Sequence, residues 1–309
     1  MSKTAAAKKK GTAGKGIRLL LLLLFGTVFM YSLLKVTGIL SEYKKGEDIY
    51  ENVRSVYGSE KRVQEEEPPR EVREAGTAAE EAPGGNTDAE APVKDYSAYE
   101  HPKKLDFLHT NFDYLLVPRY VFDFEALKEL NPEVLGWIMI EGTYVDYPVV
   151  QGADNVFYLR HAIGGEENNA GSVFADYRHE TPFFEKNTIL YAHNQRNLRM
   201  FHQLLSYEEL SYLNAHPYVD IYLPDGSMQI YRIYSCHLEA GTASYAVRFQ
   251  DTQVFSEFIA YTKETSLYDA GVPVFPEDRI LTLVTCTDEA DENRVVLHAV
   301  LVDELMPEK

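Results

Sequence analysis

The chain has 309 residues, enough for one large domain with appendages, and its formal net charge is −18. Six of its 30 basic residues precede Leu19, where there is no acidic residue, so the remainder is strongly acidic. This charge argues against a nucleic-acid partner, because a phosphate backbone needs a cationic surface. Only two cysteines occur, too few for a secreted scaffold stapled by disulfides.

The N-terminal 40 residues predict a membrane anchor. Residues 1–18 are small, polar and basic, and residues 19–40 are apolar except for Lys35, whose long side chain can reach the lipid headgroups. A cleaved signal peptide shares this layout, but the polar residues 41–44 offer no small-residue cleavage site. A retained single-pass helix over 19–40 is favoured, with residues 1–18 in the cytoplasm and the bulk of the chain outside.

Residues 41–104 are expected to be an acidic, low-complexity linker. The runs Glu65–Pro69 and Ala78–Gly85 are too polar and too rich in Pro and Gly to build a core. A short helix is possible over Asp48–Val63. The folded domain is predicted to span residues 105–309.

Short strands separated by turn residues dominate this domain. One helix is expected over 124–130, with Asp123 as its N-cap and Asn131-Pro132 as its stop, and another over 251–264. A capping box, Ser206 to Glu209, predicts a third. The expected strands are 136–140, 144–150, 172–175, 188–192, 218–223, 229–238, 280–285 and 294–302. About eight such strands favour a mainly β fold, a barrel or a sandwich, with additional helices.

Three of these strands have a reactive side chain at one end. The strand over 280–285 leads into Cys286, the strand over 188–192 leads into His193, and Arg294 opens the last strand. A cysteine nucleophile needs a cation to stabilise its thiolate, a base to shuttle a proton, and a positive group facing the oxyanion. These three residues supply all three functions if the fold brings the strand ends together.

Other groups compete for these roles. Cys236 is expected to be a small buried residue or to pair with Cys286, and the adjacent His237 points to the opposite face of its strand. His298 is a rival base, because alternation puts it on the same face as Arg294. The histidines lack zinc-site spacing, and no Gly-x-Ser-x-Gly motif occurs, so neither a metal, a cofactor nor a serine nucleophile is expected.

The cysteine and histidine motifs resemble those of sortases, the membrane-anchored cysteine transpeptidases of Gram-positive surfaces. Residues 282–286 read Thr-Leu-Val-Thr-Cys, like the family's TLxTC signature, and residues 191–194 resemble its histidine motif, with Arg294 where its arginine falls. Further stretches resemble class B sortases: 136–138, 147–151, 154–159, 171–174 and 266–269. The resemblance covers about residues 105–305 and implies a closed eight-stranded sortase barrel.

The resemblance also implies a mechanism and partners. Cys286 would attack a C-terminal sorting signal of NPxTx type after its threonine, His193 would carry the proton, and Arg294 would stabilise the oxyanion. The substrate-binding residues implied are Asn155, Leu159, Tyr191, Thr285 and Thr287, with strand-end packing the alternative for Tyr191. The partners implied are surface proteins that carry the signal and a lipid-linked cell-wall precursor that offers an amine.

Two other functions stay open. A sortase of this kind can polymerise pilins, and a tethered domain can use the fold to bind peptides without turnover. The intact set of cysteine, histidine and arginine favours the enzyme.

Overall fold

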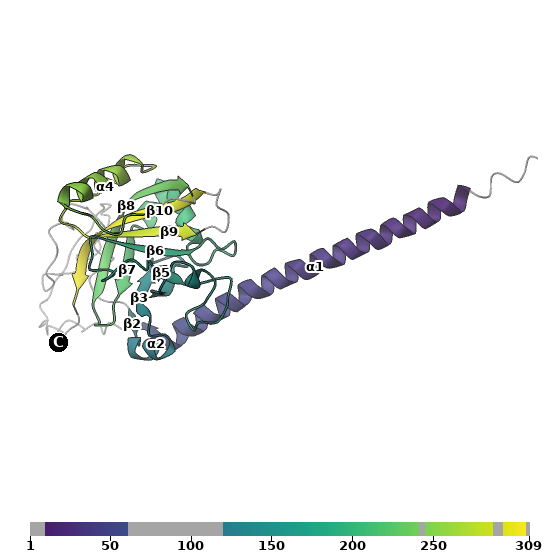
Figure 1. The fold of residues 1–309 in the computed structure, drawn as a ribbon, viewed down its shortest axis with the longest axis horizontal. Coiled ribbons are helices and arrows are strands. Elements are labelled where there is room, and N and C mark those ends of the chain that lie inside the picture. Colours follow the sequence, from purple (N-terminus) through teal and green to yellow (C-terminus); the bar gives the residue numbers. More distant parts are fainter. Residues whose placement is uncertain (1–9, 61–119, 241–244, 287–292, 307–309) are drawn as a thin grey trace, which may run out of the picture.

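The computed structural model describes residues 10–60, 120–240, 245–286 and 293–306. It consists of a closed β-barrel and one long N-terminal helix that projects from it (Figure 1). The helices are α1 (Lys10–Tyr57), α2 (Phe124–Leu130), α3 (Leu210–Ala215) and α4 (Thr252–Glu264), with single-turn or short 3₁₀ segments at Phe157–Leu159 and His202–Glu208. The strands are β1 (Gly58–Glu60), β2 (Tyr120–Phe122), β3 (Val134–Met139), β4 (Asp146–Val150), β5 (Val173–Ala175), β6 (Asn187–His193), β7 (Tyr218–Tyr222), β8 (Met228–Ala240), β9 (Ile280–Cys286) and β10 (Asn293–Leu305).

The barrel confirms the predicted eight-stranded closed fold. Its strand order is β10-β8-β7-β3-β4-β5-β6-β9, and β9 pairs with β10 to close the ring. Most neighbours are antiparallel, but β4–β5 and β6–β9 are parallel. A parallel pair places the C-terminal ends of both strands at the same edge, so the end of β6 and the end of β9 meet.

Strands β6 and β9 are made largely of buried apolar side chains. Ile189, Leu190, Leu281 and Leu283 have no exposed surface. Continuous apolar runs of this kind are typical of parallel strands covered on both faces. His179 anchors β6 from outside the strand, because its Nε2 accepts a hydrogen bond from the Ile189 amide at 2.9 Å.

Two helices begin where the sequence predicts. The Asp123 side chain accepts a hydrogen bond from the Ala126 amide at the start of α2, and Asp251 accepts one from Val254 at the start of α4, each at 2.9 Å. The capping box at Ser206 is wrong. Residues 202–208 form a 3₁₀ segment, and α3 begins at Leu210 without a side-chain cap.

Helix α1 runs unbroken for 48 residues, through the predicted anchor and on to the barrel. Residues 41–57, which we expected to belong to the linker, are helical, and Tyr50 and Val53 are buried in the core of the domain. Tyr57 is followed by the two-stranded β1–β2 sheet. The other residues of the expected linker, from 61 onward, lie outside the described residues.

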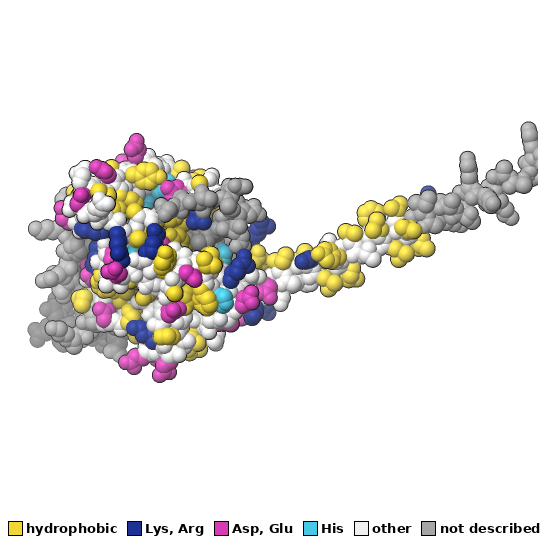
Figure 2. Space-filling view, in the orientation of Figure 1, with side chains coloured by type: hydrophobic (Ala, Val, Ile, Leu, Met, Phe, Trp, Pro, Cys, Tyr) yellow, Lys and Arg dark blue, Asp and Glu magenta, His cyan; other side chains and the backbone are white. Residues whose placement is uncertain are grey.

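The N-terminal part of α1 has the composition of a membrane span. Among the described residues, one helix is long and apolar enough to cross a bilayer, and it lies near the N-terminus. Its side chains from Leu19 to Leu40 are exposed, and Figure 2 shows hydrophobic groups along the projecting part of the helix. A wholly exposed apolar helix of this length is unstable in water and suited to lipid.

Candidate active site

The backbone brings the three predicted strand ends together. His193 and Cys286 are the last residues of β6 and β9, and they are directly paired in the parallel register. On the other side of β9, the antiparallel ladder pairs Val296 with Val284. Extending that register by two residues sets Arg294 opposite Cys286. Residues about 90 positions apart in the sequence therefore occupy adjacent places at one barrel edge.

His193 is held by two hydrogen bonds, one to its ring and one to its backbone. The ring Nε2 lies 2.5 Å from the carbonyl oxygen of Leu159, and the Phe201 amide donates to the His193 carbonyl at 2.9 Å. A carbonyl only accepts, so Nε2 carries the proton in this contact. Nδ1 is then the ring nitrogen left to exchange a proton with a substrate. The side chain is partly exposed, as proton exchange with a substrate requires.

Arg294 sits at the start of β10, opposite Glu239 of β8. Its Nε is buried and has no hydrogen-bond partner within the described part of the chain. Burial raises the pKa of the neighbouring Tyr245, Glu239 raises it further, and Arg294 lowers it, so the phenol lies near both charges. The residue as a whole is partly exposed, and a guanidinium beside the strand ends that carry Cys286 and His193 is a suitable donor to a substrate carbonyl or oxyanion.

Two of the predicted substrate residues converge on a carboxylate that the sequence reading missed. Asn155 donates to Asp176 Oδ2 at 3.0 Å, and the Tyr191 hydroxyl donates to the same oxygen at 3.1 Å. Arg178 binds both carboxylate oxygens, at 2.7 and 2.8 Å. Burial acts to raise the pKa of Asp176, but the hydrogen bonds from Arg178 and Asn155 lower it to about 2. Asp176 is therefore a permanent anion beneath the Tyr191 side of the site.

A short pattern in the sequence could have indicated this anion. Asp176 follows β5 directly, two residues before Arg178, and an Asp-x-Arg pair at the end of an apolar strand is compatible with a local ion pair. What the sequence could not show is that β5 lies next to β6, which sets this pair beside Tyr191.

The remaining predicted substrate residues are placed differently. Leu159 is half-buried, and its carbonyl binds His193. Thr285 is buried, and its hydroxyl accepts a hydrogen bond from the Val295 amide at 2.9 Å, which occupies it within the sheet. Any role of Thr285 in substrate binding would therefore involve its backbone. Thr287 lies outside the described residues.

The rival groups lie inside the fold. Cys236 is a free, buried cysteine, and burial raises the pKa of its thiol to about 12. His298 is buried, its Nδ1 lies 2.9 Å from the Thr282 hydroxyl, and its ring stacks on His237. Burial lowers the pKa of His298 well below its ordinary value, so the ring stays neutral. Among the described residues, no group of three His, Cys, Asp or Glu side chains is placed to hold a metal ion.

Comparison with known proteins agrees with this geometry. A family model for the sortase domain matches residues 138–302, more than half of the chain, so the chain belongs to the sortase family. Members of this family are cysteine transpeptidases.

Within the family, the similarity is to sortase B, which confirms the resemblance seen in the sequence. The chain is 37% identical to sortase B of Listeria monocytogenes over 182 residues, which are 57% of this chain and 72% of that protein. A mutant form of Clostridium perfringens sortase B superposes with a TM-score of 0.55 at 32% identity, over 58% of this chain and 86% of the other. A Staphylococcus aureus sortase B–substrate complex gives 0.54 at 32% identity, over 58% and 84%.

Proposed function

We propose that this chain is a membrane-anchored class B transpeptidase that cleaves an NPxTx-like sorting signal after its threonine and transfers the protein to an amine. The observation that carries the proposal is the direct pairing of His193 with Cys286, with Arg294 reached by extending the neighbouring ladder. The amine is that of a lipid-linked cell-wall precursor. The anchor holds enzyme, substrate and acceptor near one plane and so raises their effective concentration.

The proposed reaction has two steps. In the first, the Cys286 thiolate attacks the threonine carbonyl, a C–S bond forms, and the C–N bond to the next residue breaks as protonated His193 gives its proton to the departing amine. In the second, the acceptor amine attacks the thioester and gives a proton back to His193, and the thiolate leaves. Arg294 stabilises the oxyanion in both steps, and the Thr287 backbone N–H is a second proposed donor.

The substrate groove is proposed to run along the 154–159 segment and the end of β6. The Asn155 side chain is partly exposed and the Tyr191 side chain is buried, and Asp176 fixes both, so the wall of the proposed groove is ordered. Fixed polar groups of this kind bind an extended peptide at low entropic cost. By the positive-inside rule, the N-terminus is cytoplasmic and the barrel is extracellular.

The test is cleavage of a quenched NPxTx-type peptide by the full chain in detergent micelles. Cys286→Ala and His193→Ala should each lower kcat by about a thousandfold or more, and Arg294→Lys by about a hundredfold. The matched control is Cys236→Ala, which removes the buried thiol and should leave cleavage intact. Undiminished cleavage by Cys286→Ala would contradict the assignment, and loss with Cys236→Ala alone would transfer the role to the other cysteine.

The acceptor arm of the same experiment separates the alternatives. Faster product formation when a cell-wall-type amine is added supports transpeptidation to that acceptor. Product formed only with a pilin-type lysine would favour the polymerising alternative. Peptide binding without any cleavage would favour a silent binding module.

A further inference from the structure

The segment of α1 that follows the membrane span touches the barrel at a few defined points. Gly46 lies so close to the loop before β5 that a Cβ there would be 2.9 Å from the Ala170 Cβ. Tyr50 and Val53, one and two turns further on, are buried. The three positions share one helical face, since they are spaced by four and three residues.

The first contact between α1 and the barrel is connected by hydrogen bonds to the loop that binds the ring of His193. The Tyr50 hydroxyl donates to the Gly171 carbonyl at 2.5 Å and lies 3.0 Å from the Ser172 hydroxyl. The Ser172 amide in turn donates to the Tyr158 carbonyl at 2.9 Å. The next carbonyl, that of Leu159, receives the His193 Nε2 hydrogen bond.

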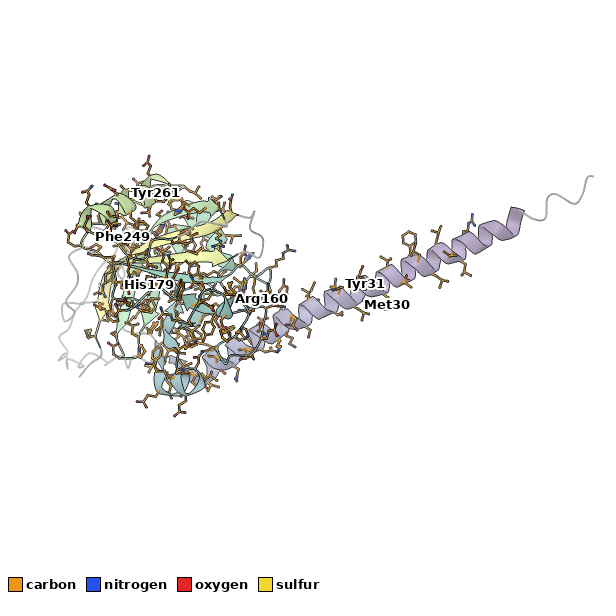
Figure 3. The ribbon with its side chains drawn as sticks, viewed as in Figure 1. Met30, Tyr31, Arg160, His179, Phe249 and Tyr261 are labelled. Atoms are coloured by element: carbon orange, nitrogen blue, oxygen red, sulfur yellow. The ribbon has the colours of Figure 1, made fainter. Side chains whose placement is uncertain are left out.

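Gly171 makes this contact tight. Its φ is +61°, and a Cβ there would lie 2.5 Å from the Tyr158 oxygen and 2.8 Å from the Leu159 oxygen. Only glycine fits this turn, because a side chain would separate the two loops. Tyr50 therefore fixes the turn that lies directly against the carbonyl binding His193. In Figure 3, Arg160 of this loop lies on the side of the domain from which α1 projects.

The second contact between α1 and the barrel involves the loop that binds the backbone of His193. Arg199 forms a salt bridge with Glu47, and Glu51 lies 3.6 Å away. The Tyr50 ring packs edge-on against Tyr147, whose hydroxyl accepts from the Met200 amide at 3.0 Å. The same loop ends at Phe201, whose amide binds the His193 carbonyl. Both hydrogen bonds that hold His193 thus come from loops that α1 contacts.

Helix α1 and the barrel do not pack closely around Tyr50 and Glu47. A cavity of about 280 Å³ lies between them, lined in part by Tyr50, Glu47, Tyr147 and Met200. Neighbouring apolar side chains therefore cannot replace a contact that is lost beside this cavity. We expect the structural effect of such a loss to be local.

We propose that residues 46–54 of α1 are a brace, and that Tyr50 and Glu47 are positioning residues for the proposed catalytic role of His193. The helix that anchors the chain also holds the two loops that orient the imidazole. The inference rests on the proposed function for its activity readout but not for its structural readout. Neither residue touches the reacting atoms, so both act on kcat through the geometry of His193.

The test compares wild type, Tyr50→Phe, Glu47→Gln and the double variant as full chains in detergent micelles. Each substitution keeps the side-chain shape: Tyr50→Phe removes the hydroxyl that contacts Gly171 and Ser172, and Glu47→Gln removes the charge that pairs with Arg199. The double variant should lose about tenfold in kcat, with KM changed less than about twofold, since a small displacement of a catalytic group slows the chemical step. Hydrogen exchange should accelerate in residues 157–172 and 194–201. The control is Asn52→Ala, on the exposed face of the same helix, which should match wild type in both measurements.

Two results would overturn the brace. One is a double variant with wild-type kcat and wild-type exchange in both loops. The other is a loss of kcat with faster exchange over the whole barrel, which reports general destabilisation. If the wild type cleaves no peptide, the proposed function has failed, and the exchange pattern alone decides the brace.

Discussion

At the scale of single residues, the site depends on an anion that takes no direct part in the proposed reaction. Asp176 has no exposed surface and gathers Asn155, Tyr191 and Arg178. Its hydrogen bonds satisfy both oxygens, which compensates for the cost of burying the charge. The residue is thereby a fixed support for the proposed groove beside His193.

Asp176→Asn should lower stability by an amount that depends on pH in a defined way. The folded-state pKa of Asp176 is about 2, below its ordinary value, so its ionised form stabilises the fold at neutral pH. This contribution is fully present above about pH 4 and is lost as the pH falls toward 2. Urea unfolding of both proteins between pH 2 and 8 checks it. A difference that widens as the pH falls below 4 would contradict the assignment.

At the scale of elements, local sequence signals predicted the start of a helix correctly where tertiary packing did not favour another structure. The N-cap of α2 is Asp123 as predicted, and α4 begins at Thr252, one residue from the predicted start, with Asp251 as its N-cap. The signal at Ser206 failed because Leu204 and Tyr207 are fully buried and the Tyr207 hydroxyl binds the His216 carbonyl. Burial of two large side chains outweighs a capping bond of about 1 kcal/mol.

A pair of substitutions measures this difference. Asp251→Ala removes the bond to the Val254 amide and should cost about 1 kcal/mol of unfolding free energy. Ser206→Ala should cost less than about 0.5 kcal/mol, because no helix starts from that side chain. Chemical denaturation of the two variants gives the comparison, and equal losses would mean that the Ser206 hydroxyl has an unrecognised role.

At the scale of the whole molecule, the apolar N-terminal span and the barrel share one element. Helix α1 carries the apolar span and then joins the core through Tyr50 and Val53 (Figure 1). The helix rises about 1.5 Å per residue, so about 15 Å separate Leu40 from Tyr50 along its axis. Arg54 adds an ion pair with Asp146 at 3.0 Å. The barrel is therefore joined to the apolar span by a helix rather than by a free tether.

A soluble fragment should accordingly need the second half of α1. A fragment of residues 41–309 keeps the docked helix, whereas one of residues 58–309 exposes the surface that Tyr50 and Val53 cover. The shorter fragment should be less stable by about 3 kcal/mol or more, from the burial of two such side chains. Thermal unfolding of both fragments, with the full chain in detergent as reference, tests this. Equal midpoints would mean that α1 rests on the barrel without stabilising it.

The sequence by itself determined the apolar N-terminal segment, the eight strands and the strand ends that carry His193, Cys286 and Arg294. These features are local, since they follow from runs of apolar residues and from the polar residues that interrupt them. Only the tertiary structure decided which strands are neighbours. The parallel pairing of β6 with β9 and the position of Asp176 depend on contacts between distant segments.

The docking of residues 46–54 onto the barrel could not be predicted from the sequence, because it too depends on contacts between distant segments. Their acidic composition indicates a solvated segment, and just two side chains of that stretch, Tyr50 and Val53, are buried. A helix is recognised in the sequence by a repeated apolar face, and here the barrel supplies the other half of each contact. The local pattern of apolar and polar residues therefore predicts the fold class. The support of His193 depends on surfaces that meet only after folding.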